Sequence, residues 1–240
     1  MLFTMPSLIR VNMTNRHPSR SRHPEPAQAA TDTADAARKV ARTASQEVRI
    51  IGGVWKRSPL PVPVSAGLRP TPSRVRETLF NWLGQDLSGW RVLDAFAGTG
   101  ALGLEAASRG ADEVYLLERN TTLVRALQAT QARLKATQVR VQQADALQWM
   151  NQSQRAGCFD LVFIDPPFEA EIFAPALAAG ARCVPVGGWL YLEGDRAFGD
   201  ADAEVRDAGL RLHRHAQAGA VHFHLFQRVA DAESPDSTLA

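Results

Sequence analysis

Val92-Leu-Asp-Ala-Phe-Ala-Gly-Thr-Gly-Ala-Leu-Gly103 is the stretch that decides the fold of this 240-residue chain. An apolar run that ends at Asp94 is followed by three glycines in the spacing G-x-G-x-x-G and then by an Ala/Leu-rich segment. This pattern is typical of a buried strand, a tight turn and the start of a helix. Because glycine lets the backbone approach a ligand and the first helical turn has free amide donors, the turn suits a nucleotide-like cofactor.

The glycines alone do not decide which cofactor this turn holds. The spacing from Gly98 and Gly100 onward fits NAD and S-adenosylmethionine equally well. Asp94 favours S-adenosylmethionine, because a carboxylate at the end of the strand would repel a diphosphate and attract an ammonium and a sulfonium. Glu118, which ends the next predicted strand at 114–117, can accept both ribose hydroxyls of an adenosine. A strand-to-helix turn without any ligand is the alternative interpretation.

Length and composition favour one α/β domain with a tail, because 45% of the residues are hydrophobic and short apolar runs alternate with helical stretches. Residues 1–80 hold 13 Lys/Arg against 5 Asp/Glu, whereas residues 81–240 hold 14 against 20. A basic N-terminal part on an acidic body suggests contact with a polyanion. No apolar run is long enough to cross a bilayer, so we expect no membrane contact. Cys158 and Cys183 indicate free thiols in a reducing compartment, the cytoplasm.

We expect residues 1–45 to be a disordered basic tail and residues 230–240 a polar tail, on either side of a domain at 46–229. The first segment mixes Pro, Ser, Ala, Thr and Arg without a period, so it cannot bury a core. An Arg-rich start that is poor in acidic residues also resembles an organellar transit peptide. A misplaced start codon is equally plausible, since Met5 and Met13 follow.

A basic hairpin is predicted at 48–62, ahead of the glycine turn. Two short strands around a Gly-Gly pair would leave Arg49, Lys56 and Arg57 on the surface. The hairpin is either an ornament at the edge of the sheet or a ribbon that contacts RNA phosphates. Trp55, which lies among the cations as a possible stacking face, favours the second interpretation.

The next segment is predicted to be a helix whose start can bind an anion. Thr71 followed by proline indicates the helix start, and the apolar positions within 73–83 have the helical spacing of a core-facing stripe. Arg69, Arg74 and Arg76 fall around this start and along the polar side of the helix. Their guanidinium groups could hold a phosphate or the carboxylate of the cofactor. A solvated surface charge is the alternative for each of them.

The most informative tetrapeptide consists of Asp165, Pro166, Pro167 and Phe168, directly after a predicted strand at 159–164. The two prolines stop the strand and stiffen the turn, so the carboxylate and the first proline's carbonyl become fixed acceptors beside an aromatic ring. Two acceptors can hold the two N–H groups of a planar exocyclic amine while the ring stacks on the base. This arrangement favours methyl transfer to that nitrogen by positioning and electrostatics. Asp165 would take the proton, and no metal is needed.

Two further patterns leave alternatives open. Asp145 stands between a short strand and a helix, where it is either only the N-cap or also a partner of the adenine amino group. Four histidines alternate in pairs near the C-terminus, at His213, His215, His222 and His224. Because no Cys, Asp or Glu is interleaved at ligand spacing, we interpret them as surface residues of two strands rather than as metal ligands.

These motifs resemble those of the bacterial small-subunit ribosomal RNA guanine-N2 methyltransferases, over about Val48 to Arg228. The strings that carry the resemblance are Arg49-Ile-Ile-Gly-Gly53, Gly67-Leu-Arg-Pro-Thr-Pro72, Arg74-Val-Arg-Glu-Thr-Leu-Phe-Asn-Trp-Leu83, Asp94-Ala-Phe-Ala-Gly-Thr-Gly-Ala-Leu-Gly103 and Asp165-Pro-Pro-Phe168. The N-terminal strings are specific to this family, whereas the other two occur in many amine methyltransferases. The resemblance implies a class I, Rossmann-like α/β three-layer sandwich with a seven-stranded, mostly parallel sheet and an N-terminal β-hairpin.

The resemblance also implies the reaction. S-adenosylmethionine would be the methyl donor, and the N2 amine of one guanosine in 16S rRNA would be the acceptor. The RNA would be part of an assembled or assembling small subunit, and the enzyme would be a monomer. Asp94 and the glycines would hold the methionine part, Glu118 the ribose and Asp145 the adenine. The residues expected at the cofactor are Asp94, Phe96, Gly98, Gly100, Glu118, Arg119, Asp145 and Ala146; at the RNA, Arg49, Lys56, Arg57, Arg69 and Arg74; at the target guanine, Asp165, Pro166, Pro167 and Phe168.

Other functions stay open on the residues alone. The nearest is the same reaction on another planar amine, either adenine N6 in a nucleic acid or a protein glutamine amide, because the tetrapeptide reads an NH2 group and not a whole base. Asp94 and the tetrapeptide argue against an NAD-dependent oxidoreductase and against a catalytically idle RNA-binding scaffold.

Overall fold

The computed structural model describes residues 47–63, 71–167 and 170–229. All of them belong to the second of two compact units of the chain, which spans Ala37–Ala240. The two predicted tails, Arg69 and Phe168 lie outside the described residues.

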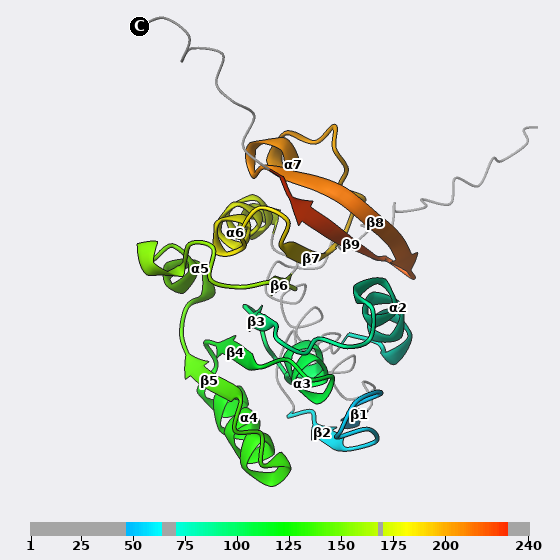
Figure 1. Cartoon of the computed structure of the whole chain (residues 1–240), viewed down its shortest axis with the longest axis vertical. Coiled ribbons are helices and arrows are strands. Elements are labelled where there is room, and N and C mark those ends of the chain that lie inside the picture. The colour runs from blue at the N-terminus through cyan, green and yellow to red at the C-terminus, as the bar shows by residue number, and fades with distance from the viewer. Residues whose placement is uncertain (1–46, 64–70, 168–169, 230–240) are drawn as a thin grey trace, which may run out of the picture. The chain divides into compact units, whose positions relative to one another are not determined.

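A seven-stranded sheet forms the centre of this unit, in the order β5-β4-β3-β6-β7-β9-β8 (Figure 1). Its strands are β3 (Arg91–Asp94), β4 (Glu113–Glu118), β5 (Val139–Gln143), β6 (Leu161–Ile164), β7 (Trp189–Gly194), β8 (Leu210–Ala218) and β9 (Val221–Arg228). Strands β3 to β7 pair in parallel, and β9 is antiparallel to both β7 and β8. The predicted α/β fold with a seven-stranded, mostly parallel sheet is therefore confirmed.

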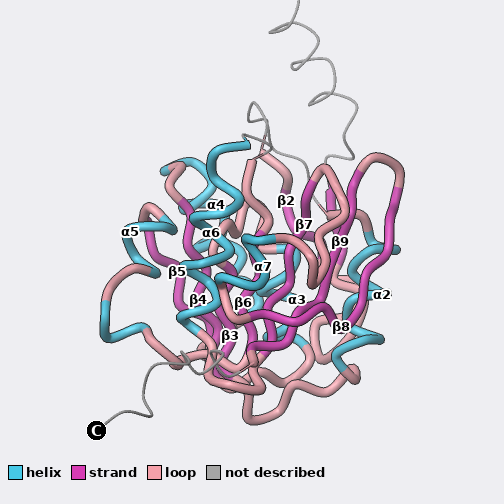
Figure 2. The backbone as a smooth tube through the Cα atoms, turned by 90° about the horizontal axis from the view of Figure 1, so that it is seen from above, coloured by secondary structure: helices cyan, strands magenta, loops and turns pink. Residues whose placement is uncertain are grey.

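Helices lie on both sides of the sheet, as the two views in Figures 1 and 2 show. They are α2 (Ser73–Leu83), α3 (Ala101–Ser108), α4 (Thr121–Leu134), α5 (Ala146–Met150), α6 (Ala170–Cys183) and α7 (Ala203–Asp207), with a 3-10 turn at Ser153–Arg155. Because successive strand residues point to opposite faces, Val92 packs in the core with α2 and α3 while Leu93 packs in the core with α5, α6 and α7. Two buried faces explain why β6 is continuously apolar.

The predicted N-terminal hairpin is present, but its strands are shorter than expected. β1 (Glu47–Arg49) pairs antiparallel with β2 (Pro59–Pro61), and residues 50–58 connect them instead of a tight turn at the Gly-Gly pair. The connection lies against α3, where the backbone N–H of Val54 donates to the carbonyl of Ser108 at 2.8 Å. A Cβ on Gly53 would lie 1.7 Å from that carbonyl oxygen, and Gly53 has φ +70°, so this close approach requires glycine.

Trp55 lies at the edge of the domain core, and its role as a stacking face stays a prediction. Its side chain is half-buried and packs against the apolar core, and its backbone N–H donates to Ser108 Oγ at 2.9 Å. Lys56 and Arg57 are exposed beside it. Lys56 and Arg57 are therefore accessible to an outside partner, while the tryptophan anchors the hairpin to the domain.

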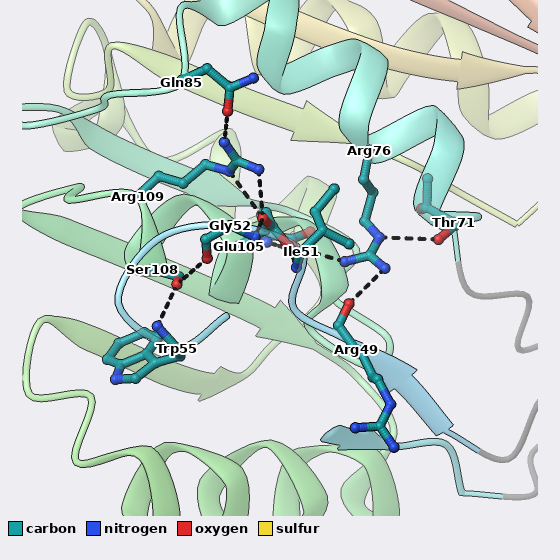
Figure 3. Close-up of polar contacts among 12 residues, drawn as sticks. Arg49, Ile51, Gly52, Trp55, Thr71, Arg76, Gln85, Glu105, Ser108 and Arg109 are labelled. Carbon is teal, nitrogen blue, oxygen red and sulfur yellow. Dashed lines mark hydrogen bonds and ion pairs between the residues drawn. The ribbon is translucent and has the colours of Figure 1, made fainter. Parts of the chain in front are cut away.

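A buried ionic network joins the hairpin to α2 and α3 (Figure 3). Glu105, in α3, is fully buried and accepts the backbone N–H groups of Ile51 at 2.8 Å and Gly52 at 2.7 Å. The same carboxylate pairs with Arg76 Nη1 at 3.1 Å and with Arg109 Nη2 at 2.9 Å. The interpretation of Arg76 as an anion-binding residue on the polar side of the helix is wrong, because Arg76 is 1% exposed and neutralises Glu105.

Arg76 also fixes the chain on either side of α2. Its Nη2 donates to the carbonyl of Arg49 at 2.9 Å, and its Nε donates to the carbonyl of Thr71 at 3.3 Å. Thr71 does not cap the helix as predicted, since α2 begins at Ser73 and the N-cap position is Pro72 without a side-chain cap. The start of α2 is instead held through backbone contacts with this buried guanidinium.

The histidines of β8 and β9 differ in burial. His213, His215 and His222 are exposed or half-buried, but His224 is completely buried and accepts the backbone N–H of Phe198 at its Nε2. Burial lowers the pKa of His224 to about 4. The prediction of surface residues is therefore wrong for His224, which serves as a neutral acceptor in the core.

Several described features bear on metals, thiols and membranes. Cys158 and Cys183 are both free, and Cys183 is buried. Within residues 47–63, 71–167 and 170–229, no group of three or more His, Cys, Asp or Glu side chains could hold a metal ion. No helix in these ranges is long and apolar enough to span a bilayer.

Candidate active site

A cavity of about 550 Å³ opens where the carboxyl ends of β3, β4, β6 and β7 meet. The neighbours of β3 are β4 on one side and β6 on the other, so the chain reverses its strand order here, and this is where open α/β sheets bind ligands. The predicted site residues that line the cavity are Asp94, Phe96, Gly98, Glu118, Arg119, Asp145, Ala146, Asp165, Pro166 and Pro167.

Some predicted residues lie elsewhere. Gly100 is not among the lining residues; it has φ +77°, and a Cβ there would lie 2.7 Å from Leu127 and 2.9 Å from Leu104, so packing beneath the turn accounts for this glycine. The predicted RNA-binding residues Arg49, Lys56, Arg57 and Arg74 are exposed on the surface and also do not line the cavity.

Asp94 fixes the glycine turn to the end of β3. The carboxylate is 2% exposed, and its Oδ2 accepts the backbone N–H of Gly103 at 2.9 Å. A Cβ on Gly103 would lie 2.2 Å from the side chain of Leu116 and 3.1 Å from that of Asp94, so the lack of a side chain here favours the close approach of α3 to the sheet. The turn that was predicted from the glycine spacing is thus held by the carboxylate that precedes it.

The environment of Asp94 favours a positively charged ligand. Burial, and then the nearby charges of Glu118 and Glu193, raise the pKa of Asp94 to about 7, against the lowering effect of the N–H groups of Gly103 and Phe96. Among the residues that the structure describes, no ion pair joins Asp94 to a lysine or arginine. A cation in the cavity would therefore stabilise the ionised carboxylate.

Glu118 connects the glycine turn to the start of α4. Its Oε2 accepts the backbone N–H of Gly98 at 3.0 Å, and its Oε1 accepts the backbone N–H of Asn120 at 2.7 Å. Each carboxylate oxygen can accept more than one hydrogen bond, so both oxygens retain capacity for the hydroxyls of a ligand. The half-buried carboxylate is thus oriented by the backbone before any ligand arrives.

Asp145 caps α5, as one of its two interpretations predicted. Its Oδ1 accepts the backbone N–H of Gln148 at 2.9 Å, and the exposed side chain lines the cavity beside the buried Ala146. Because the second oxygen can still accept a donor, the cap does not exclude the contact with adenine, which stays a prediction.

The turn that begins with Asp165 lies beside the glycine turn, in the same cavity. β3 and β6 are adjacent, with Asp94 paired to Phe163, so Asp165 follows only two residues beyond the strand partner of Asp94. Thr71 Oγ1, from the start of α2, donates to Asp165 Oδ2 at 3.5 Å. Pro166 is buried and Pro167 exposed. The two turns that sequence analysis singled out thus open into one shared cleft.

Glu193 is a cavity residue that sequence analysis missed. It is 4% exposed, lies near the end of β7 and lines the same cavity as Asp165. The signal is present in the sequence, because Glu193 follows the apolar run Trp189-Leu-Tyr-Leu192 in the same way as Asp94, Glu118 and Asp165 follow theirs.

A family model and several known proteins match the part of the chain that forms the sheet and the cavity. A family model described as conserved hypothetical protein 95 matches residues 48–227. Ribosomal RNA small subunit methyltransferase D of Escherichia coli (strain K12) is 39% identical over 203 residues, which cover 82% of this chain and 98% of the relative. The protein of the same name from Haemophilus influenzae is 44% identical over 137 residues, 56% of this chain and 71% of the relative.

Solved structures extend the comparison to the backbone. The structure of yhhF from Escherichia coli, which is described as a methyltransferase, is 35% identical with a TM-score of 0.67, and the match covers 76% of this chain and 98% of that one. Because the family model begins at residue 48, the likeness includes the hairpin as well as the sheet.

Proposed function

Because the chain belongs to the family described as conserved hypothetical protein 95 and to that of the ribosomal RNA small subunit methyltransferases D, we propose that it methylates the N2 amine of a guanosine in 16S rRNA. S-adenosylmethionine is the methyl donor. The observation that carries the proposal is the shared cavity, where the turn after β3 and the turn after β6 face the same space.

The residues around the glycine turn fit this cofactor. When bound, S-adenosylmethionine supplies a methyl group on a positively charged sulfonium. Asp94 offers a buried carboxylate that a cation would keep ionised, and Glu118 offers two oriented oxygens to the ribose hydroxyls. Asp145 accepts the adenine amino group with the oxygen that does not cap α5. A diphosphate would meet three carboxylates in the same space, which disfavours a dinucleotide.

The turn after β6 holds the amine that receives the methyl group. Asp165 would accept one N–H of the amine and the carbonyl of Pro166 would accept the other, and together they would hold the amine nitrogen in one orientation. Methylation of this nitrogen would release one of its protons, and Asp165 would take that proton up. Phe168, which lies outside the described residues, is predicted to stack on the base.

The RNA reaches this site from the basic hairpin. Arg49, Lys56 and Arg57 on the hairpin and Arg74 on α2 are exposed cations that can contact phosphates without entering the cavity. We propose that the enzyme acts as a monomer on an assembled or assembling small subunit in the cytoplasm. The catalytic domain comprises residues 46–229, between an N-terminal basic tail and a C-terminal polar tail.

The reaction is tested by its product. Purified protein, isotope-labelled S-adenosylmethionine and small subunits from cells that lack the gene should yield one labelled N2-methylguanosine in 16S rRNA, read by nucleoside mass spectrometry. Asp165→Asn should lower the rate by at least about a thousandfold, because both positioning and proton uptake are lost, while affinity for S-adenosylhomocysteine changes less than about threefold. Labelled N6-methyladenosine, or a normal rate in the variant, would contradict the proposal.

A further inference from the structure

The last two strands of the sheet form a basic segment on an otherwise acidic body. Residues 208–229 contain three arginines and four histidines but no Asp or Glu, whereas residues 81–240 hold 14 Lys/Arg against 20 Asp/Glu. This segment comprises β8 and β9, and β8 stands at the end of the strand order. A local excess of cations at a sheet edge points to an anionic partner.

A β-bulge places two of these arginines on one face of the sheet. The register between β8 and β9 shifts between Leu212 and Arg214, so Arg211 pairs with Gln227 while Arg214 pairs with Leu225. The two partners are two positions apart in β9 and therefore share a face. In a regular strand, residues three apart point to opposite faces, so the bulge is what brings both guanidinium groups to the same side.

This face is also the one on which the cavity opens. Leu225 and Phe223 pack in the core with α2 and α3, and Phe223 stacks on Trp82 of α2 with ring centroids 5.3 Å apart. Figure 1 shows α2 beside the end of β8 accordingly. Val221, at the start of β9, lines the cavity itself. The two arginines therefore lie on a strip of β8 that leads away from the cavity wall.

The strip has the reach that a nucleic acid with one base in the cavity would need. Ala218 pairs with the cavity residue Val221, and Arg214 and Arg211 lie further back along β8. At about 3.3 Å per residue, and with the bulge allowed for, they stand about 13 and about 20 Å from the cavity wall. Between the wall and Arg214 the same face carries Ala216 and Ala218, which are half-buried and small.

Both guanidinium groups are exposed. Within residues 47–63, 71–167 and 170–229, no ion pair engages Arg211 or Arg214. Arg214 Nη1 donates to the carbonyl of His213 at 2.9 Å, and the ring of His213 packs edge-on against Trp189 with centroids 4.9 Å apart. A guanidinium that is held in place and keeps further N–H groups for a partner suits a phosphate.

The N-terminal hairpin lies at the other end of α3 from the cavity. Ala101, which begins α3, lines the cavity, whereas Ser108, which ends α3, contacts the connection of the hairpin. The helix rises about 1.5 Å per residue, so the two ends are about 10 Å apart. Lys56 and Arg57 follow that connection, so a second group of cations nearer the cavity would complete the track of an RNA.

We propose that Arg211 and Arg214 on β8 bind phosphates of the RNA that flanks the target nucleotide. The proposal rests on the proposed function and adds a second RNA contact to that of the N-terminal hairpin. Cations and a bulge on an edge strand also discourage pairing with a second copy of the chain. That protective role does not require both arginines on the cavity face, where the bulge places them.

The test measures binding of protein-free 16S rRNA transcript over a series of KCl concentrations. Each arginine that contacts a phosphate steepens the dependence of log affinity on log salt by about 0.7 to 0.9. Arg211→Gln and Arg214→Gln should each lower the slope by about that amount, and the double variant should lower it by about 1.5. At about 0.1 M salt, the Kd of the double variant should rise about ten- to a hundredfold.

A matched control and two further measurements guard the interpretation. Arg206→Gln removes an exposed arginine from α7, which packs on the other face of the sheet, and should leave the slope unchanged. Binding of the same variants to small subunits from cells that lack the gene tests for a protein partner. Light scattering tests whether the loss of either β8 arginine makes the chain self-associate.

The outcomes separate the two proposals. If the unaltered protein methylates no guanosine, the proposed function is wrong. If it does, and Arg211→Gln and Arg214→Gln keep the full salt slope, the assignment of β8 to RNA is wrong while the proposed function stands.

Two patterns would name another role for the β8 arginines and would contradict the assignment. Weaker binding to small subunits with an unchanged slope on protein-free rRNA would indicate a ribosomal protein as the partner. Self-association with an unchanged slope would indicate protection of the sheet edge. A lower slope in Arg211→Gln and Arg214→Gln, but not in Arg206→Gln, supports the RNA contact.

Discussion

Two buried carboxylates on the same side of the sheet have opposite electrostatic surroundings. Glu105, in α3, is fully buried and is surrounded by two guanidinium groups and two backbone N–H groups. Asp94, at the end of β3, is 2% exposed and accepts backbone N–H groups, and the charged neighbours that shift its pKa are other carboxylates. One charge is neutralised within the chain, whereas the other is left for a ligand to neutralise.

The difference separates a structural site from a binding site. A buried charge is tolerated when it is paired and fully hydrogen-bonded, as Glu105 is, and it then joins elements that are distant in sequence. A buried carboxylate that lacks a cation shifts its pKa instead, as Asp94 does. For this reason, ionisable groups in clefts whose pKa values are shifted are candidates for functional residues. The hairpin junction and the cavity are therefore distinguished by charge balance, not by burial.

The largest effect is expected at the hairpin junction. Glu105→Gln keeps the shape but leaves Arg76 and Arg109 without their buried counter-charge, so the free energy of unfolding should fall by about 3–5 kcal/mol. Urea denaturation at constant pH measures it. Glu113→Gln is the matched control, since Glu113 pairs with Arg91 and Arg140 at the surface and should lose no more than about 1 kcal/mol. Equal losses in the two variants would contradict the assigned role of Glu105.

At Asp94 we expect a smaller effect, which lowers the affinity for the cofactor rather than the stability of the fold. Asp94→Asn keeps an acceptor for Gly103 but removes the charge, so affinity for S-adenosylmethionine should fall about ten- to a hundredfold by calorimetry. The pKa of Asp94 is higher in the folded chain than in the unfolded chain. Its favourable contribution to the free energy of unfolding is therefore complete below its ordinary pKa of 3.8, and it is lost as pH rises through about 7. The variant should therefore be no less stable than the unaltered chain at pH 8. A stability loss in Asp94→Asn as large as that in Glu105→Gln would contradict the distinction between a binding role for Asp94 and a structural role for Glu105.

Much of the fold and of the cavity follows from local patterns. The apolar runs, the glycine spacing and the carboxylates at strand ends predicted the sheet, the two turns and their shared edge, because parallel strands end on one side. The shared edge brought Asp94, Glu118, Asp145 and Asp165 into one cavity, as their positions at strand ends predicted. Their roles toward cofactor and base stay predictions.

The buried polar groups were not predictable in the same way. Arg76 and Glu105 are 29 positions apart, and their pairing depends on how α2, α3 and the hairpin pack together. A signal existed in α3 nonetheless, because Glu105 is the one acidic residue of a helix buried on all sides. The burial of His224 is unpredictable for a related reason, since alternation in a hairpin does not reveal that Phe198 packs against this ring and donates its backbone N–H to Nε2.

The most direct test is the proton balance of cofactor binding. Titration calorimetry with S-adenosylmethionine, in buffers that differ in ionisation enthalpy, measures the protons released on binding. With an Asp94 pKa of about 7 in the free chain and an ionised carboxylate in the complex, close to one proton should be released at about pH 6 and only about a quarter at about pH 7.5. Asp94→Asn should abolish this release. Binding of equal affinity without proton release at either pH would contradict the account, because Asp94 would then not be the carboxylate that the cofactor neutralises.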